Sequence, residues 1–217
     1  MHRILILIFI PFINITAHSQ SEFGFEQYSY LGTGQLGTLV PVAHYKTHSN
    51  WYAEARYNYD NFNTFSLYAG RTFSGDKNVV YSITPMIGGM AGASHGGSLG
   101  LNAEFDYKGF NFSSQSQYSV IASSRADNYF FSWSELSYQP LEWLYAGVSL
   151  QNTHINEGGP LTEPGLLVGF SYKHVTVPFY SFNPFASQRY FILGLSWEFN
   201  YNRSGKKQPV PVLVQNP

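Results

Sequence analysis

Hydrophobic and polar side chains alternate along most of the chain after its first twenty residues. In residues 191–201 the odd-numbered positions are large and apolar or aromatic, whereas the even-numbered positions are mostly small or polar. The same period recurs in residues 51–59 and 99–107, where the charged side chains fall on one face only. Because successive side chains of a strand point to opposite faces, this pattern predicts strands that separate two environments.

The alternating segments predict an all-β, antiparallel fold. Most of the predicted strands have about 9 to 12 residues, close to the length with which a tilted strand crosses a bilayer. They cover residues 24–31, 36–47, 50–59, 64–73, 78–89, 97–107, 110–121, 128–138, 142–152, 164–173, 175–182 and 189–201. Their number is therefore about twelve, which is even as in bacterial outer-membrane barrels, and about ten is the alternative because residues 22–40 alternate poorly.

The polar face of these strands differs from the wet face of a soluble sandwich. It carries Ser, Gly, Asn, Gln and Thr with few charges, and charged residues make up 12% of the chain while aromatic residues make up 18%. A hydrated lumen, an apolar face against lipid and aromatic residues at strand ends explain this composition. We therefore predict an antiparallel transmembrane β-barrel, with a soluble, secreted lipocalin-like barrel that binds a small molecule as the alternative.

The N-terminus has the features of an export signal. Arg3 precedes an almost continuous apolar stretch over residues 4–15, and Ala17 and Ser19 follow at the spacing that a signal peptidase needs. The stretch is shorter than the roughly 20 residues of a membrane-spanning helix. We predict a cleaved signal peptide over residues 1–19, the barrel over residues 20–201, a periplasmic tail over residues 202–217, and a location in the outer membrane.

The connections between the predicted strands differ in length on the two sides of the sheet. Tight turns fall mostly on one side, which we assign to the periplasm, and longer connections fall mostly on the other. The longer ones are expected at residues 90–96, 122–127 and 153–163. Glycines in and next to the first of these predict a flexible extracellular loop.

The last predicted strand ends in aromatic residues. Leu195, Trp197 and Phe199 share its apolar face, a pattern that resembles the closing strand by which outer-membrane barrels are handled by the barrel assembly machinery. With residues 51–59 and 65–70, this strand makes the chain similar to outer-membrane β-barrel proteins of Bacteroidota-type bacteria. The resemblance implies outer-membrane lipid and the assembly machinery as partners, and it implies no particular activity. In that class an aromatic residue commonly ends the chain, whereas here a tail follows.

No spacing of side chains predicts catalysis or a bound metal. His48 and Ser49 are adjacent, so on a strand they would point to opposite faces, unlike the H-x-S arrangement of outer-membrane lipid hydrolases. The chain has no Cys, and its other histidines are scattered singly. Twelve Lys and Arg against 13 Asp and Glu give no basic surface for nucleic acid. We expect no cofactor and no enzymatic activity, with a lipid hydrolase as the alternative.

One set of ionisable side chains is predicted to face the lumen, because a charge on the lipid face costs up to about 2 to 4 kcal/mol at mid-membrane. The set consists of Glu54, Arg56, Glu104, Asp106, Glu135 and Glu198. The phase of Glu135 also places Phe131 and Trp133 inward, which argues against a wide channel. Either Arg56 pairs with these carboxylates and braces a filled lumen, or the acidic excess favours cations or basic solutes. The predicted function is thus a small pore or a structural or surface barrel.

Overall fold

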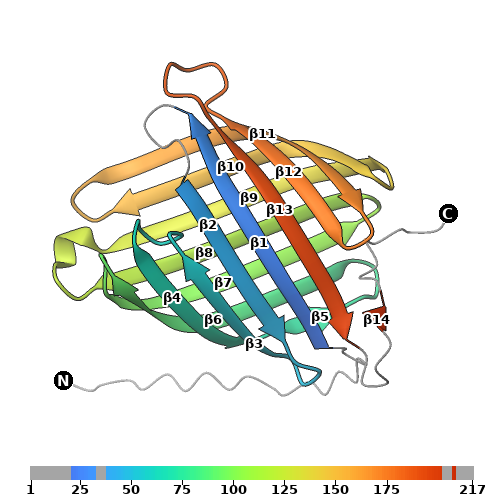
Figure 1. The fold of residues 1–217 in the computed structure, drawn as a ribbon, viewed down its shortest axis with the longest axis horizontal. Coiled ribbons are helices and arrows are strands. Elements are labelled where there is room, and N and C mark those ends of the chain that lie inside the picture. The colour runs from blue at the N-terminus through green and yellow to red at the C-terminus, as the bar shows by residue number, and fades with distance from the viewer. Residues whose placement is uncertain (1–20, 33–37, 202–206, 209–217) are drawn as a thin grey trace, which may run out of the picture.

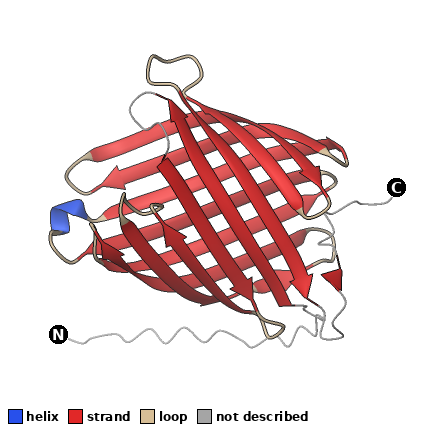
Figure 2. Ribbon diagram, viewed as in Figure 1, coloured by secondary structure: helices blue, strands red, loops and turns tan. Residues whose placement is uncertain are grey.

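The computed structural model describes residues 21–32, 38–201 and 207–208. They form one antiparallel sheet that curls into a barrel (Figures 1 and 2). In the described part of the chain, no helix has the length and apolarity needed to cross a membrane. The predicted signal peptide lies outside the described residues, and so does the predicted tail apart from Lys207 and Gln208.

Fourteen strands occur in the described residues. They are β1 (Ser21–Gly32), β2 (Thr38–Lys46), β3 (Trp51–Tyr57), β4 (Thr64–Arg71), β5 (Phe73–Gly75), β6 (Val80–Gly92), β7 (Gly96–Tyr107), β8 (Phe110–Ile121), β9 (Tyr129–Leu141), β10 (Leu144–Ile155), β11 (Gly159–Tyr172), β12 (Val175–Phe182), β13 (Tyr190–Tyr201) and β14 (Lys207–Gln208). Neighbours in the sheet are mostly neighbours in sequence. The chain therefore winds once around the barrel.

Twelve of these strands close the barrel. Strand β5 extends β4 along β6, and β14 pairs only with the last two residues of β13. The ring is completed by β13, which pairs with β1 from Ser21 opposite Tyr201 to Gly32 opposite Tyr190, and Figure 1 shows the two strands side by side. The predicted number of about twelve is confirmed. Closure satisfies the backbone groups that an open edge would leave unpaired in lipid.

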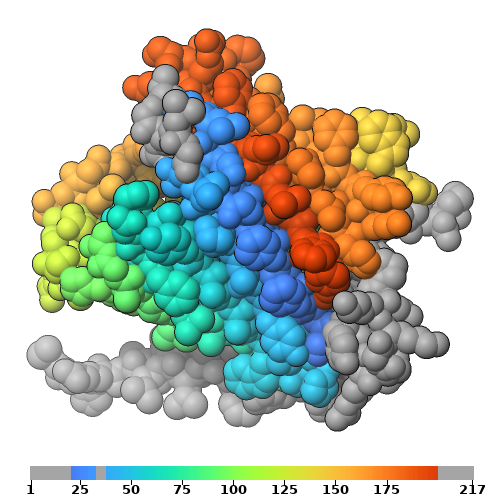
Figure 3. Space-filling view, viewed as in Figure 1, coloured from blue at the N-terminus to red at the C-terminus, as the bar shows by residue number. Residues whose placement is uncertain are grey.

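The two faces of the wall differ as the alternation predicts. On β13, Leu193, Leu195 and Trp197 are 42 to 47% exposed on the outer face, whereas Ile192 is fully buried inside. Large apolar side chains are likewise exposed on the outside of β4, β7 and β11. Figure 3 shows side chains covering the outer face over β1, β2 and β13. This apolar outer surface suits contact with lipid.

Ser21 and Tyr201, the first and last residues of the barrel wall, lie opposite each other. They are at the end of the barrel that carries the tight turns, which we call the turn end. Lys108 and Gly109 alone connect β7 to β8, with φ values of 47° and 82°, the left-handed conformations that a two-residue hairpin turn requires. The opposite end, called the loop end, carries the connections over residues 58–63, 93–95, 122–128, 156–158 and 183–189. The two-residue turns at residues 108–109 and 173–174 thus fall on one side, as expected for the tight turns.

Two connections at the loop end are shorter than predicted. The prediction of a long loop over residues 153–163 is wrong, because β10 continues to Ile155 and β11 begins at Gly159, which leaves residues 156–158 as the connection. The expected flexible glycine-rich loop is also wrong, because β6 and β7 remain paired as far as Met90 and Gly96. Backbone hydrogen bonds do not require alternating side chains, so these hairpins extend beyond the last clear alternation.

Candidate functional site: the lumen

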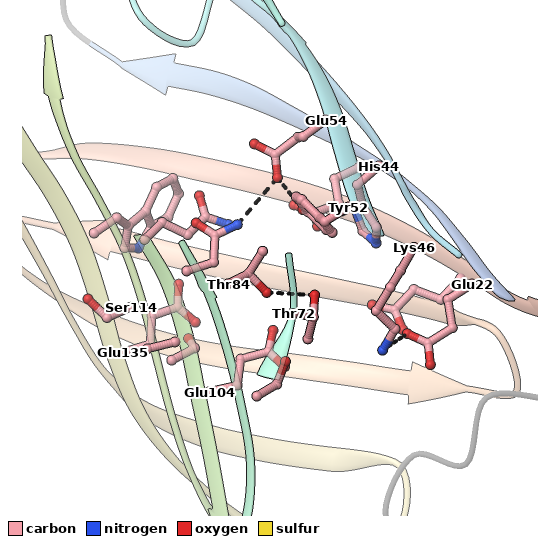
Figure 4. Close-up of a pocket in the computed structure, with 18 of the residues that line it drawn as sticks. Glu22, His44, Lys46, Tyr52, Glu54, Thr72, Thr84, Glu104, Ser114 and Glu135 are labelled. Carbon is pink, nitrogen blue, oxygen red and sulfur yellow. Dashed lines mark hydrogen bonds and ion pairs between the residues drawn. The ribbon is translucent and has the colours of Figure 1, made fainter. Parts of the chain in front are cut away.

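The lumen is filled toward the loop end and hollow toward the turn end. Phe182, Ile192 and Ser119 point inward toward the loop end and have no solvent exposure. Inward side chains nearer the turn end surround a cavity of about 320 Å³ (Figure 4). We call the filled region the packed tier. We call the hollow region the acidic cavity, because six Glu side chains line it.

An aromatic cluster fills one side of the packed tier. Its buried members are Trp133, Leu167, Tyr180, Phe182 and Ile192. Trp133 lies edge-on to Tyr180 and Phe182, with ring centroids 5.2 and 5.9 Å away. Its Nε1 donates a 2.8 Å hydrogen bond to Ser149 Oγ, so the polar atom of the buried indole is satisfied. Phe131 packs against the cluster, and the predicted inward phase of Phe131 and Trp133 is confirmed.

A polar network around Arg56 fills the other side. Arg56 is 2% exposed, forms an ion pair with Glu54, and donates a 2.6 Å hydrogen bond from Nη1 to Gln117 Oε1 on β8. Its guanidinium lies 4.4 Å from the ring centroids of both Tyr59 and Tyr68. A desolvated cation–π contact contributes about 2 kcal/mol. One carboxylate, one amide and two rings therefore stabilise this buried charge.

The loop between β3 and β4 supplies part of this network. Tyr59 and Asp60 of the loop contact inward side chains of β8, because Tyr59 Oη donates a 2.7 Å hydrogen bond to Gln115 Oε1 and Gln117 Nε2 donates to Asp60. Burial raises the pKa of the Tyr59 phenol well above its ordinary value, so the hydroxyl stays protonated and can donate. The packed tier is thus built from the wall and from one loop.

Most of the charged side chains that line the acidic cavity are carboxylates. They are Glu22, Glu26, Glu54, Glu104, Glu135 and Glu198. Lys46 and His44 also line it, with Lys46 Nζ 2.7 Å from Glu22 Oε2 and His44 Nδ1 3.8 Å from Glu26 Oε1. Figure 4 shows Glu22, Glu54 and Glu104 reaching the cavity from different walls of the barrel.

Three of the six carboxylates have no ion-pair partner among the described residues: Glu104, Glu135 and Glu198. Lys46 and Arg56 each balance one of the remaining three, so carboxylates outnumber basic groups whether or not His44 is protonated. A recess lined by one sign of charge raises the local concentration of the opposite ion. The cavity is therefore suited to cations or to basic groups of a solute.

The structure places all but one of the predicted lumen residues in the packed tier or the acidic cavity. Glu54, Glu104, Glu135 and Glu198 line the cavity, and Glu54 also pairs with Arg56 in the packed tier. Asp106 is on the inward face of β7 closer to the turn end, where Asn111 Nδ2 donates a 2.8 Å hydrogen bond to it. The prediction that Arg56 pairs with one of the carboxylates agrees with this geometry.

Sequence reasoning missed several residues of the site. Glu22 and Glu26 of the cavity occupy even positions of β1 together with Tyr28, which was an available signal, but Gln27 and Ser29 interrupt the apolar face and hide the alternation. Tyr59 and Asp60 left no such signal, because alternation does not report a loop that folds inward.

The two residues weighed as a catalytic pair lie outside the strands of the barrel. His48 and Ser49 lie in the turn between β2 and β3, where Ser49 Oγ is 3.0 Å from Thr47 Oγ1. No group of three or more His, Cys, Asp or Glu side chains in the described ranges is placed to hold a metal ion.

Comparison with known proteins yields structural matches. No protein-family model and no curated protein matches the chain. The KdgM porin in complex with oligogalacturonate superposes with a TM-score of 0.57 at 10% identity, covering 81% of this chain and 98% of the porin. The NanC porin superposes with a TM-score of 0.55 at 10% identity, covering 80% of this chain and 97% of the porin. The chain therefore has the fold of these porins.

Proposed function

We propose that this chain is a non-catalytic barrel of the outer membrane and a small pore that favours cations or basic solutes. The observation that carries the proposal is the carboxylate-lined cavity inside a closed barrel with an apolar outer face. Rings of acidic side chains favour the passage of cations. The porin fold supports a transport role on the same barrel.

The charge of the cavity argues against carrying over the ligand of a structural neighbour. Oligogalacturonate, which is bound to one of these porins, is a polyanion. In this chain the cavity lining holds six Glu side chains and only Lys46 and His44 as basic residues, so a polyanion would be repelled. A solute of the opposite charge fits the described lumen better.

Selectivity in a planar bilayer tests the proposal. We expect Glu104→Gln combined with Glu135→Gln to reduce the cation preference, measured as the reversal potential in a salt gradient. The matched control is Glu142→Gln combined with Glu157→Gln, which removes two carboxylates from exposed turns at the two ends of the barrel and should leave the preference unchanged. A folded lumen variant with unaltered selectivity would refute the role of the acidic cavity.

A structural or surface barrel is the second candidate, and the packed tier favours it. Buried side chains such as Phe182 and Ile192 leave little room for solvent at the loop end. The same recordings decide between the two functions. A barrel that shows heat-modifiable migration in gels, as folded barrels do, but conducts no current would be structural, whereas stable cation-selective steps would identify a pore.

Export and assembly are part of the proposal. Residues 1–19 would direct export and be removed, residues 202–217 would lie in the periplasm, and the barrel assembly machinery would recognise Leu195, Trp197 and Phe199 before insertion into outer-membrane lipid. Leu195 and Trp197 are exposed on the outer face of β13, where they would contact lipid after insertion. An origin in Bacteroidota-type bacteria remains a prediction. Amino-terminal sequencing of the protein from an outer-membrane fraction tests the cleavage.

A further inference from the structure

We propose that the loop over residues 58–63 is the constriction of the lumen, and that Tyr59 and Asp60 determine whether a solute passes the loop end. The effect of this constriction on transport rests on the proposed pore function. The position of the loop inside the barrel can be tested separately.

The loop is folded against the wall at both of its ends. Asn58 and Asn63 have φ values of 58° and 53°, in the left-handed region that Asn tolerates better than most residues. The backbone N–H of Asn63 donates a 2.8 Å hydrogen bond to Asn58 Oδ1, and Asn58 Nδ2 donates a 3.0 Å bond to the carbonyl of Leu39 on β2. These bonds hold the intervening residues in a fixed reversal.

Tyr59 spans the lumen. It follows β3, yet its hydroxyl donates to Gln115 on β8 and its ring lies edge-on to Phe131 on β9, with centroids 5.8 Å apart. Strands β4, β6 and β7 separate β3 from β8 around the wall, so this contact crosses the interior. Tyr59 thereby joins the polar network around Arg56 to the aromatic cluster and closes the space between them.

Asp60 connects the same walls through hydrogen bonds. Its carboxylate accepts from the side chains of Ser66 on β4, Gln117 on β8 and Tyr129 on β9, the last at 3.2 Å. Gln117 is 4% exposed, although an inward glutamine of an open aqueous pore would contact water. Phe62 of the same loop is 61% exposed, so only part of the loop takes part in the closure.

Conductance measures the effect of removing the constriction. We expect Tyr59→Ala combined with Asp60→Ala to raise single-channel conductance several-fold over the wild-type chain, because both groups that cross the lumen are lost. The control Phe62→Ala removes an exposed ring from the same loop and should leave conductance unchanged. Heat-modifiable migration in gels shows that each variant forms a barrel.

Thiol labelling tests the position of the loop without requiring any current. The chain has no Cys, and Ser119, which is fully buried and pairs with Tyr129 in the sheet, lies beside two partners of Asp60. We expect Ser119→Cys to resist a charged methanethiosulfonate reagent in the wild-type background and to react in the Tyr59→Ala/Asp60→Ala background.

The two readouts separate the constriction from the pore function. Labelling of the loop variant without any current would support the constriction and refute the pore. A folded loop variant that stays unlabelled and conducts no better than the wild-type chain would overturn the constriction. Labelling of Ser119→Cys in the wild-type background at the rate of the loop variant would also overturn it.

Discussion

The packed tier and the acidic cavity are built on the same strands, yet their inward side chains have opposite character. On β9, Glu135 projects a carboxylate into the cavity, whereas Trp133, two positions nearer the loop end, borders the cavity but is buried in the aromatic cluster. On β13, Glu198 lines the cavity and Ile192 is packed. Inward side chains of this barrel therefore do not share one environment. The position of a residue between the loop end and the turn end determines whether its side chain contacts water or other side chains.

The difference predicts how each region responds to substitution. A packed interior resists changes of volume and the loss of buried partners. A hydrated recess tolerates changes of side chain and responds mainly through its charge. The free energy of unfolding should therefore report on the packed tier, and ion selectivity should report on the acidic cavity.

Loss of the buried cation should have the largest effect on stability. Arg56→Ala leaves the buried Glu54 carboxylate without its ion-pair partner and removes the cation between the Tyr59 and Tyr68 rings. Breaking a buried pair on one side costs about 3 to 5 kcal/mol. Urea unfolding in detergent or lipid, followed by tryptophan fluorescence, measures the change. Arg71→Ala, which removes an exposed arginine from β4, is the control, and equal losses in both variants would contradict a packed tier around Arg56.

An added methyl group should lower stability at a glycine on the inner face of the wall but not at its neighbour on the outer face. A Cβ at Gly88 would lie 2.4 Å from Tyr68 Cδ1, whereas at Gly89 the nearest heavy atom would be 3.6 Å away. Overpacking costs about 1 to 3 kcal/mol, so Gly88→Ala should lower the urea midpoint and Gly89→Ala should not. A midpoint for Gly88→Ala equal to that of the wild-type chain would show that both the Tyr68 ring and the backbone at Leu67, whose oxygen would lie 2.7 Å from the added Cβ, can move away.

Removal of one buried hydrogen bond should have a smaller effect. Trp133→Phe keeps an aromatic ring in the cluster but removes the donor to Ser149. We expect a loss of about 1 kcal/mol from the hydrogen bond, the net contribution of a typical one, and a further loss from the smaller ring, with a total below that of Arg56→Ala; the same unfolding assay measures it with fluorescence of the remaining tryptophans. Trp143→Phe, at a tryptophan that is 51% exposed, should change stability less. The reverse ranking would contradict the burial of Trp133 in a rigid cluster.

The wall of the barrel could be predicted from the sequence, and its interior only in part. The bounds of β8 and β12 match the predicted segments 110–121 and 175–182, because alternation is a local property that pairing preserves. Inward placement of Glu104 and Glu135 followed from the cost of charges in lipid. The separation into two tiers did not follow, since it depends on contacts such as that of Trp133 with Tyr180, which lie far apart in sequence.

The loop that closes the packed tier shows a second limit of prediction from the sequence. Nothing in the sequence around Tyr59 and Asp60 distinguishes an inward loop from an exposed one, because their partners Gln115, Gln117 and Tyr129 are reached only across the closed barrel. The length of the hairpin formed by β10 and β11 was also misjudged, since backbone pairing continues where side-chain alternation ends. The local alternation of side chains thus predicts the strands, whereas contacts across the closed barrel determine which residues fill the lumen.

The smallest effect on stability is expected at the acidic cavity. Glu104 is exposed to solvent, has no ion-pair partner among the described residues, and shares the cavity with five other carboxylates. Glu104→Gln removes one of these like charges and no packing contact of the packed tier, so the free energy of unfolding should change by no more than about 0.5 kcal/mol. The same urea assay that detects the loss in Arg56→Ala measures this change. A loss comparable to that of Arg56→Ala would place Glu104 in a bound network, and the two regions of the lumen would then no longer differ in their tolerance of substitution.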